Sequence, residues 1–293
     1  MSHSTLNHLA LLEKTRREIL HKSDLIPPLP DLVARLLGIL NKQNTEPAHL
    51  EGLLQNDQVL VAKMLAMVNS PFYGLNRSIR TIKEAVMVLG FRGVRSLVLA
   101  TSTAKFLQRD FGCYGHQPKG LWLHAVSVAA ASRRIARACK MTPDEAEILF
   151  VAGLLHDIGK LLLVTYLGGA DAKGSLQTST CDYERSRVGL DHAEAGSLVT
   201  AKWNLAPEIQ QVIQAHHTMA TPATSRMTAV VRVADAVAHE RGTGYQPGAA
   251  PKGVVAADDL AVIGLTEASW TTLRDEIVAT MDEAVAALGS LSA

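Results

Sequence analysis

Apolar side chains recur along this chain at spacings of three and four residues, which is the period of an amphipathic helix. Segment 31–42 (DLVARLLGILNK) illustrates the pattern, because Leu32, Leu36 and Leu40 fall on one helical face. The same criterion predicts further helices over residues 58–69, 81–90, 94–108, 121–139, 143–165, 190–203, 206–217, 224–241 and 266–289. Convincing alternation of period two, which marks a half-buried strand, is absent from the sequence. The pattern therefore predicts an all-α protein.

Residues 110–120 (DFGCYGHQPKG) interrupt the helical pattern with glycines and a proline, and they predict a connection between two helical lobes. We expect an N-terminal lobe over residues 1–115 and a second lobe over residues 116–241. Residues 242–293 are expected to form a loop and a C-terminal helix that packs on the second lobe. Self-association of that helix in a homodimer is the alternative. Its apolar positions at helical spacing are Trp270, Leu273, Ile277, Met281 and Val285.

The motif NSPFYG (69–74) separates two predicted helices. Asn69 and Pro71 are residues that interrupt a helix, so the motif is interpreted as a tight turn with Phe72 and Tyr73 packed inward. The alternative is that the two aromatic rings are exposed and form a contact for a partner.

Charge and composition narrow the classes of partner. The chain has 29 basic and 28 acidic residues, so we expect neither a nucleic acid nor a membrane surface as partner. The basic run SRRIARACK (132–140) is interpreted as the solvated face of a helix. We expect no membrane-spanning helix, because no apolar run approaches the roughly 20 residues that span a bilayer. Cys113, Cys139 and Cys181 form no paired motif, which predicts a reduced, cytoplasmic setting.

Three ionisable residues interrupt the apolar stretch ILFVAGLLHDIGKLLLV (148–164), namely His156, Asp157 and Lys160. An ionised carboxylate in an apolar setting costs several kcal/mol unless another group compensates its charge. A divalent metal compensates well, and neutral imidazole nitrogens and carboxylate oxygens are its natural ligands. The stretch therefore raises the hypothesis of a metal site.

Further residues of the same chemistry fall in the second lobe. A single histidine on an apolar face is more often a hydrogen-bonded core residue than a ligand. Several in one lobe weaken that interpretation, and the residues alone leave a metal site and a hydrogen-bonded network both open. The candidates are His124, His156, Asp157, His192, His216, His217 and Asp235.

The order His124, His156–Asp157, Asp235 resembles the HD superfamily of metal-dependent phosphohydrolases. A narrower resemblance, covering roughly residues 20–240, is to the HDOD (HD-related output domain) family. It is carried by LIPPLPDLVARLL, NSPFYG, FVAGLLHDIGKLLL and GLDHAEAGSLVTAKWNLAPEIQQVIQAHH. The resemblance implies an HD-type helical bundle in the C-terminal lobe. It also implies a regulatory output module of bacterial signal transduction, acting with a signalling protein partner.

The resemblance also implies roles for single residues. His124, His156, Asp157 and Asp235 would bind a first metal. His192, His216 and His217 would bind a second, with Asp157 as the bridge. The cofactor would be one or two divalent ions, Fe, Mn or Zn. In an active enzyme Asp157 and Lys160 would be catalytic, with Lys160 near the phosphate of a nucleotide-type phosphodiester. Glu184 falls at a position that is often acidic in HDOD relatives.

The chain departs from the cyclic-di-GMP phosphodiesterase branch of the HD superfamily. That branch follows its paired histidines with a glutamate and a loop ending in Gly-Tyr-Pro. Here the sequence continues HHTMATPATSRM, and GTGYQP (242–247) differs because Gln246 separates tyrosine from proline. We therefore rank a regulatory output module first. A metal-dependent phosphohydrolase acting on a nucleotide or cyclic dinucleotide is the alternative.

Overall fold

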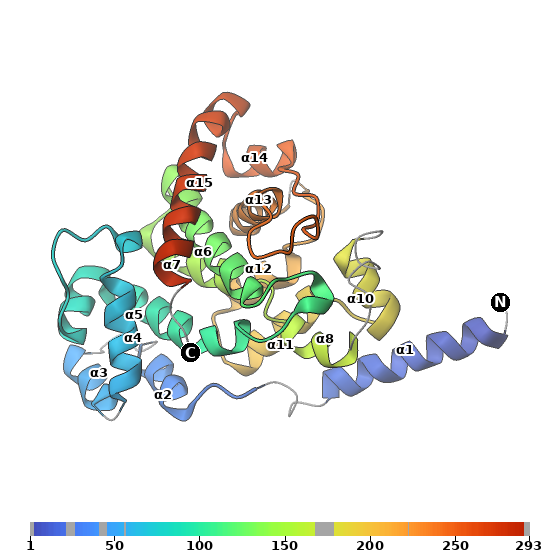
Figure 1. Ribbon diagram of the computed structural model, residues 1–293, viewed down its shortest axis with the longest axis horizontal. Helices are drawn as coiled ribbons and strands as arrows, with labels where there is room; N and C mark the ends of the chain where they lie inside the picture. Colours follow the sequence, from blue (N-terminus) through green and yellow to red (C-terminus); the bar gives the residue numbers. More distant parts are fainter. Residues whose placement is uncertain are drawn as a thin grey trace.

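The computed structural model describes residues 3–21, 27–40, 46–55, 57–167, 179–221 and 223–289, with side chains from residue 10 onward. Within these ranges the chain forms helices and short 3-10 turns and no strand, so the predicted all-α class is confirmed (Figure 1). An isolated β-bridge pairs His116 with Tyr245.

Four helices form the lobe at one end of the molecule (Figure 1). They are α2 (Asp31–Leu40), α3 (Pro47–Leu54), α4 (Gln58–Val68) and α5 (Ile82–Leu107). Helix α5 contacts each of the other three, and fully buried Leu36, Leu50, Met64 and Leu97 lie in this core. Burial of these apolar faces supplies most of the stability of short helices.

Helix α5 corrects the prediction of two helices over residues 81–90 and 94–108. The helix continues through both ranges, and Gly90 adopts φ 69° and ψ 175° inside it. This left-handed φ favours glycine and marks a kink rather than an end. The hydroxyl of Thr81 accepts the backbone N–H of Glu84 and caps the start of the helix.

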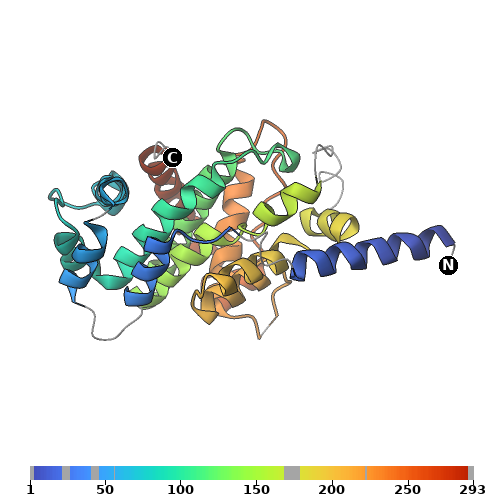
Figure 2. The same cartoon turned by 90° about the horizontal axis from the view of Figure 1, so that it is seen from below.

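The second lobe surrounds α6 (Gly120–Ala138), which packs on α7 (Pro143–Leu155), α13 (Arg226–Glu240) and α15 (Glu267–Leu288) (Figure 2). Gly153 permits a close approach of α7 to α6, because a Cβ atom there would lie 2.9 Å from the carbonyl oxygen of Val128. The remaining helices of this lobe are α8 (Lys160–Leu167), α10 (Thr180–Val188), α11 (His192–Lys202), α12 (Pro207–Ala215) and α14 (Ala257–Ile263).

The prediction of one helix over residues 143–165 is wrong in one respect. Helix α7 ends at Leu155, and α8 begins at Lys160 after a turn. Backbone N–H groups within the turn bond three residues back, as Ile158 does to Leu155. Every residue from Ile148 to Leu163 is buried, so apolar periodicity carries no sign of the break. The turn places His156 and Asp157 in the interior.

The motif NSPFYG forms a 3-10 turn, η2 (Pro71–Tyr73), whose aromatic rings pack partly buried against the core as expected. The buried guanidinium of Arg133 lies over three rings, 4.3 Å from the centroid of Phe72, 4.9 Å from Tyr73 and 4.7 Å from Phe150. The interpretation of residues 132–140 as a solvated face is therefore wrong at Arg133. Cation–π contacts compensate part of the cost of burying its charge.

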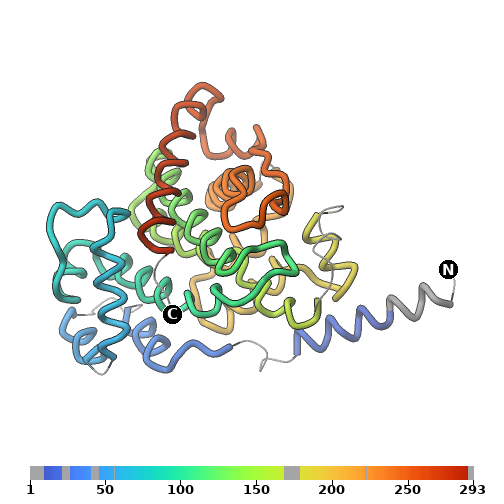
Figure 3. Tube along the Cα trace, in the orientation of Figure 1, coloured from blue at the N-terminus to red at the C-terminus, as the bar shows by residue number. Residues whose placement is uncertain are grey.

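At the two chain ends, α1 (His3–His21) and α15 make different contacts. Helix α15 lies against α6 and buries Trp270, Ile277 and Met281. Helix α1 contacts α10 and extends away from the body of the molecule (Figures 1 and 3). Arg16 on α1 forms an ion pair of 2.7 Å with Glu194 on α11.

Among the residues that the structure describes, two helical stretches are long and apolar enough to cross a bilayer by length and composition. They are Ile82–Leu107 and Pro143–Leu167. This differs from the expectation that no run approaches that length. In the apolar 18-residue window of each stretch, 56% and 89% respectively is buried inside the fold. The second is the α7–α8 stretch, and its apolar surface packs against neighbouring helices.

Candidate metal centre

An inner group of four side chains meets at the centre of the second lobe. His124 lies on α6, His156 and Asp157 in the turn after α7, and Asp235 on α13. The Nε2 atom of His124 lies 3.0 Å from Oδ1 of Asp235 and 3.7 Å from Oδ2 of Asp157. The Nε2 atom of His156 lies 3.6 Å and 3.4 Å from the same two oxygens. All four residues are at most 5% exposed.

An outer group of three histidines adjoins the inner one. His192 is the first residue of α11, while His216 and His217 follow α12. The Nε2 atom of His192 lies 3.2 Å from Oδ1 of Asp157, 3.3 Å from Nε2 of His216 and 3.0 Å from Nε2 of His217. His217 is the exposed member of the group, and the other two rings are buried. The structure thus brings all seven predicted ligands together, with Asp157 between the two groups.

Three of the imidazoles are oriented by hydrogen bonds at the ring nitrogen that faces away from the cluster. The Nδ1 atom of His156 donates to the carbonyl of Gly153 over 2.8 Å. His216 donates likewise to Ile213 over 2.6 Å, and His192 donates to the Glu184 carboxylate over 2.7 Å. Because these partners are acceptors, Nδ1 carries a proton in each ring. In a neutral ring Nε2 then presents its lone pair to the cluster. Metal-binding histidines are oriented in this way.

The donor set fits a divalent ion. The lone pairs of His192 Nε2 and His216 Nε2 face each other, and Nε2 of His217 also lies 3.0 Å from Nε2 of His192. Such opposed acceptors need a proton or a cation between them. His156 Nε2 and Asp235 Oδ1 are buried and lack a hydrogen-bond partner. Ligand atoms of His124, His156 and Asp235 lie within 4.8 Å of one another, as do those of His156, Asp157 and His216. Mixed imidazole and carboxylate ligands suit Zn²⁺, Fe and Mn²⁺.

Lys160 contributes the cationic partner of Asp157. Its Nζ atom donates to Oδ2 over 2.7 Å, and its buried side chain lies with Nζ 5.2 Å from the centroid of the Tyr114 ring. Burial alone would lower the pKa of Lys160, but the Asp157 carboxylate outweighs it and raises that pKa. Burial would raise the pKa of Asp157, and the charges of Lys160 and His156 instead hold it well below its usual range. The ion pair therefore stays charged.

The pKa values of His156 and His216 are shifted in opposite directions. Burial would lower the pKa of His156, but Asp157 and Asp235 outweigh it and raise the pKa to about 10. Burial lowers the pKa of His216 to about 3, and the charges of His156 and His192 add to that effect. In the metal-free cluster, a proton is therefore held on His156 between the two aspartates, while His216 is neutral.

Glu184 on α10 orients the outer group. Its Oε2 accepts both Nδ1–H of His192 and the backbone N–H of that residue, and its Oε1 accepts the hydroxyl of Tyr114 over 2.9 Å. The carboxylate is completely buried. It thus fixes the ring of His192, which gives a physical role to a position whose function the sequence left open.

Three aromatic residues beside the inner group were not among the predicted site residues. His239 Nδ1 lies 3.4 Å from Asp235 Oδ1, and its Nε2 is 3.0 Å from the hydroxyl of Tyr245. The Tyr245 ring stacks on His116 with centroids 4.1 Å apart. The motif GTGYQP, which differs from the Gly-Tyr-Pro loop of the phosphodiesterases, therefore lies against the cluster. The signal for His239 in the sequence is its helical spacing of four from Asp235.

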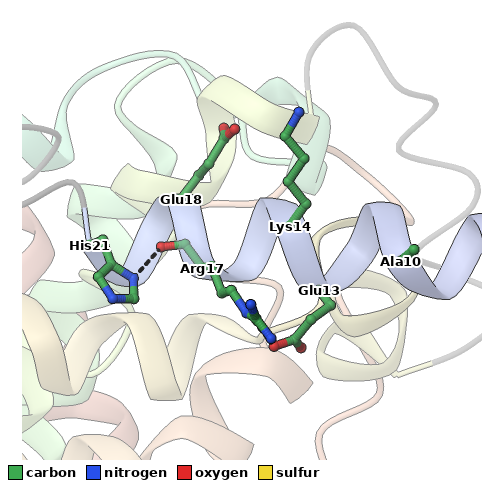
Figure 4. A pocket seen from close by; sticks show the side chains of 6 residues that line it. All are labelled: Ala10, Glu13, Lys14, Arg17, Glu18 and His21. Atoms are coloured by element: carbon green, nitrogen blue, oxygen red, sulfur yellow. Dashed lines mark hydrogen bonds and ion pairs between the residues drawn. The ribbon is translucent and has the colours of Figure 1, made fainter.

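Two of the surface pockets formed by the described residues lie outside the cluster. One, of about 640 Å³, has residues of α1 in its lining, among them Arg17 and Glu13, which form an ion pair of 2.9 Å (Figure 4). The other, of about 630 Å³, lies between α11, α12 and the start of α13, and its lining includes Asp191, Gln214 and Thr218. Neither pocket is lined by a residue of the inner group.

Comparison with known proteins agrees with this fold. The model of the HDOD domain family matches residues 26–219. An uncharacterized protein of Treponema pallidum (strain Nichols) is 27% identical over 215 residues, which are 70% of this chain and 40% of that protein. Ribonuclease Y of Ureaplasma parvum serovar 3 is 32% identical over 118 residues, covering 40% of this chain and 20% of that protein. The chain thus spans two fifths or less of these curated relatives.

Solved structures extend the likeness to nearly the whole chain. An HDOD domain protein of unknown function from Geobacter sulfurreducens has a TM-score of 0.70 and 25% identity, and the match covers 97% of this chain and 98% of that one. A protein from Shewanella amazonensis SB2B, provisionally named a phosphohydrolase, has a TM-score of 0.72 and 22% identity, with 94% and 98% covered. A provisionally named signal transduction protein from Marinobacter aquaeolei VT8 has a TM-score of 0.72 and 19% identity. That match covers 98% of this chain and 67% of the other.

Proposed function

Because the chain belongs to the HDOD domain family, we propose that it is a regulatory output module of bacterial signal transduction whose buried cluster binds one or two divalent ions. The observation that carries metal binding is the convergence of imidazole Nε2 atoms on Asp157 and Asp235, with Nδ1 of His156, His192 and His216 already engaged. Fe, Mn or Zn suits these ligands.

Enclosure of the cluster favours a regulatory role over turnover. Six of the seven candidate ligands are at most 5% exposed, and only His217 is exposed. Lys160, the candidate for contacting a substrate phosphate, is buried and already paired with Asp157. A phosphate would have to displace that ion pair, which costs several kcal/mol when one charge is left buried.

In this role a bound ion stabilises the arrangement of helices. The seven candidate ligands come from α6, α11 and α13 and from the turns after α7 and α12. An ion that binds the folded chain more tightly than the unfolded one adds its binding free energy to the stability of the fold. The module would then present a rigid surface to a signalling protein in the cytoplasm.

A metal-dependent phosphohydrolase is the second candidate, and the position of Asp157 favours it. The two carboxylate oxygens of this residue face different groups, with Oδ1 near His192 and Oδ2 near His124 and His156. Such a carboxylate suits a bridge between two ions. Bound metals would supply Lewis-acid activation of water and neutralise phosphate charge. The substrate would be a nucleotide-type phosphodiester.

Metal analysis of the purified protein tests the proposal. We expect one or two equivalents of metal in the native chain, and none in a His156→Ala/Asp157→Ala double variant. Absence of metal after incubation with Fe²⁺, Mn²⁺ or Zn²⁺ would overturn both candidates. Metal-dependent hydrolysis of a cyclic dinucleotide or a generic phosphodiester, abolished in Asp157→Ala, would favour the enzyme over the regulatory module.

A further inference from the structure

A cysteine thiol lies beside the outer histidines. Cys181 is the second residue of α10 and is buried, and it is not in a disulfide. Its Sγ atom and one ligand nitrogen each from His192 and His217 lie within 4.8 Å of one another. The predicted ligand set contained only histidine and aspartate, so this third group adds a donor of a different chemical class.

The position of Cys181 follows from the packing that orients His192. Cys181 and Glu184 are three residues apart on α10, so they lie on the same helical face. Glu184 Oε2 accepts two hydrogen bonds from His192, which ties this face of α10 to the start of α11. The thiol is therefore held near the outer group by contacts that do not involve a metal.

Nε2 of His192 is available as a metal ligand independently of the cysteine. The Nδ1 proton of His192 is donated to Glu184, so its Nε2 presents a lone pair toward Nε2 of His217 at 3.0 Å. In a tetrahedral site with ordinary Zn–N and Zn–S bonds, the ligand atoms are about 3.5 Å apart. The spacing of the Cys181 group is compatible with one shared ion after small side-chain adjustments.

We propose that Cys181 is a metal ligand, and that with His192 and His217 it forms a distinct outer site next to the inner His/Asp site. This inference rests on the proposed metal binding and adds to it the identity of one donor. Oδ1 of Asp157, 3.2 Å from Nε2 of His192, is the candidate for a fourth ligand. On binding, the thiol proton leaves to solvent and a sulfur lone pair forms the bond to the ion.

The chemical consequence is selectivity. A thiolate is a soft ligand that favours Zn²⁺, Fe²⁺ or Co²⁺, whereas Mn²⁺ prefers oxygen ligands. We therefore expect the outer site to take Zn²⁺ or Fe²⁺ in preference to Mn²⁺. The inner site has carboxylate and imidazole ligands only, so its preference is broader.

Replacement by Co²⁺ tests the assignment, because a Co²⁺–thiolate bond has a strong near-ultraviolet charge-transfer band that imidazole and carboxylate ligands do not produce. The metal-free native chain is titrated with Co²⁺ alone, beside Cys181→Ser and the control Cys139→Ser. Cys139 is half-buried at the end of α6 and belongs to none of the ligand groups found among the described residues.

We expect the band in the native chain and in Cys139→Ser. In Cys181→Ser the band should be lost, and the protein should bind one equivalent of Co²⁺ fewer than the native chain. Saturating Co²⁺ should also protect the Cys181 thiol of the native chain from alkylation, which tests the bond without any variant. Co²⁺ bound with no charge-transfer band and no protection would overturn the cysteine assignment and leave the proposed metal binding intact. No bound Co²⁺ in any of the three proteins would overturn both.

Discussion

A single carboxylate oxygen of Glu184 accepts two hydrogen bonds from His192, one from Nδ1 at 2.7 Å and one from the backbone N–H at 2.8 Å. The first determines which nitrogen of the ring is protonated, and the second positions the residue at the start of α11. Together they aim Nε2 at Asp157. Orientation of a ligand by a buried carboxylate is a common feature of histidine metal sites.

Glu184→Gln should therefore weaken metal binding without removing a ligand. A neutral amide is a poorer acceptor for Nδ1–H, so Nε2 of His192 becomes less basic and less well oriented. We expect the affinity for metal at the outer group to fall about 10- to 100-fold. Isothermal titration of the metal-free protein with Zn²⁺ measures the change.

Glu194→Gln is the matched control for that variant. Glu194 lies on α11 two residues after His192, but its carboxylate is partly exposed and pairs with Arg16 of α1. Its loss should leave the Zn²⁺ affinity within error of the native value. Equal affinities for Glu184→Gln and the native chain would mean that Glu184 has only a structural role.

Metal binding should depend on pH through His156. The pKa of this imidazole is raised to about 10 in the metal-free cluster, because Asp157 and Asp235 outweigh the effect of burial. An ion can bind Nε2 only after that proton leaves, so apparent affinity should rise about tenfold per pH unit between about pH 6 and about pH 9. The pKa of His216 is lowered to about 3, so this ring is neutral in that range and releases no proton.

Titration calorimetry in buffers of different ionisation enthalpy counts the protons released. We expect at least one proton per ion bound at the inner group. In His156→Ala the tenfold slope should become smaller, with weaker binding throughout. A pH-independent affinity in the native chain would contradict the assignment of the proton to His156.

Arg133 should contribute to the stability of the contact between α6 and η2. Its buried guanidinium lies over Phe72, Tyr73 and Phe150 and forms an ion pair of 3.4 Å with Glu147. Arg133→Ala should lower the free energy of unfolding by about 2 kcal/mol or more, because desolvated cation–π contacts and packing are both lost. Urea denaturation measures the difference.

Arg134 offers a control on the same helix. Its partly exposed side chain pairs with Glu276 on α15, and such surface pairs contribute about 0–1 kcal/mol. Arg134→Ala should therefore change the free energy of unfolding by less than Arg133→Ala does. A similar cost for the two variants would contradict a special role for the aromatic contact.

Local patterns in the sequence predicted most helices and all seven candidate ligands, but not the partners that orient them. Helix α10 (TCDYERSRV) is short and largely polar, so no apolar period indicated it. Glu184 and Cys181 lie on that helix, and only tertiary packing brings them to His192. Tyr245 reaches His116 through a loop, where the backbone pairing has no periodic signal. The break before Lys160 was hidden because every residue from Ile148 to Leu163, on both sides of it, is buried.

Gly159 lies in that break and should be needed for the approach of two segments that carry candidate ligands. A Cβ atom at Gly159 would lie 1.9 Å from the carbonyl oxygen of His192 and 2.5 Å from the backbone nitrogen of Gly196, so the turn after α7 contacts the backbone of α11 directly. Gly159→Ala should force the two segments apart, with a loss of about 1–3 kcal/mol of stability or more. Because His156 and Asp157 belong to one segment and His192 to the other, metal affinity should fall as well.

Gly38→Ala separates this effect from the general consequence of replacing a glycine. Gly38 is an exposed residue of α2, and a Cβ atom there meets nothing within 4 Å. Alanine in a helix interior is favoured over glycine by about 0.5–1 kcal/mol, so this variant should be more stable than the native chain. Thermal unfolding and Zn²⁺ titration of both variants check the pair. Native stability and affinity in Gly159→Ala would show that the approach of α11 to the turn is not needed to assemble the cluster.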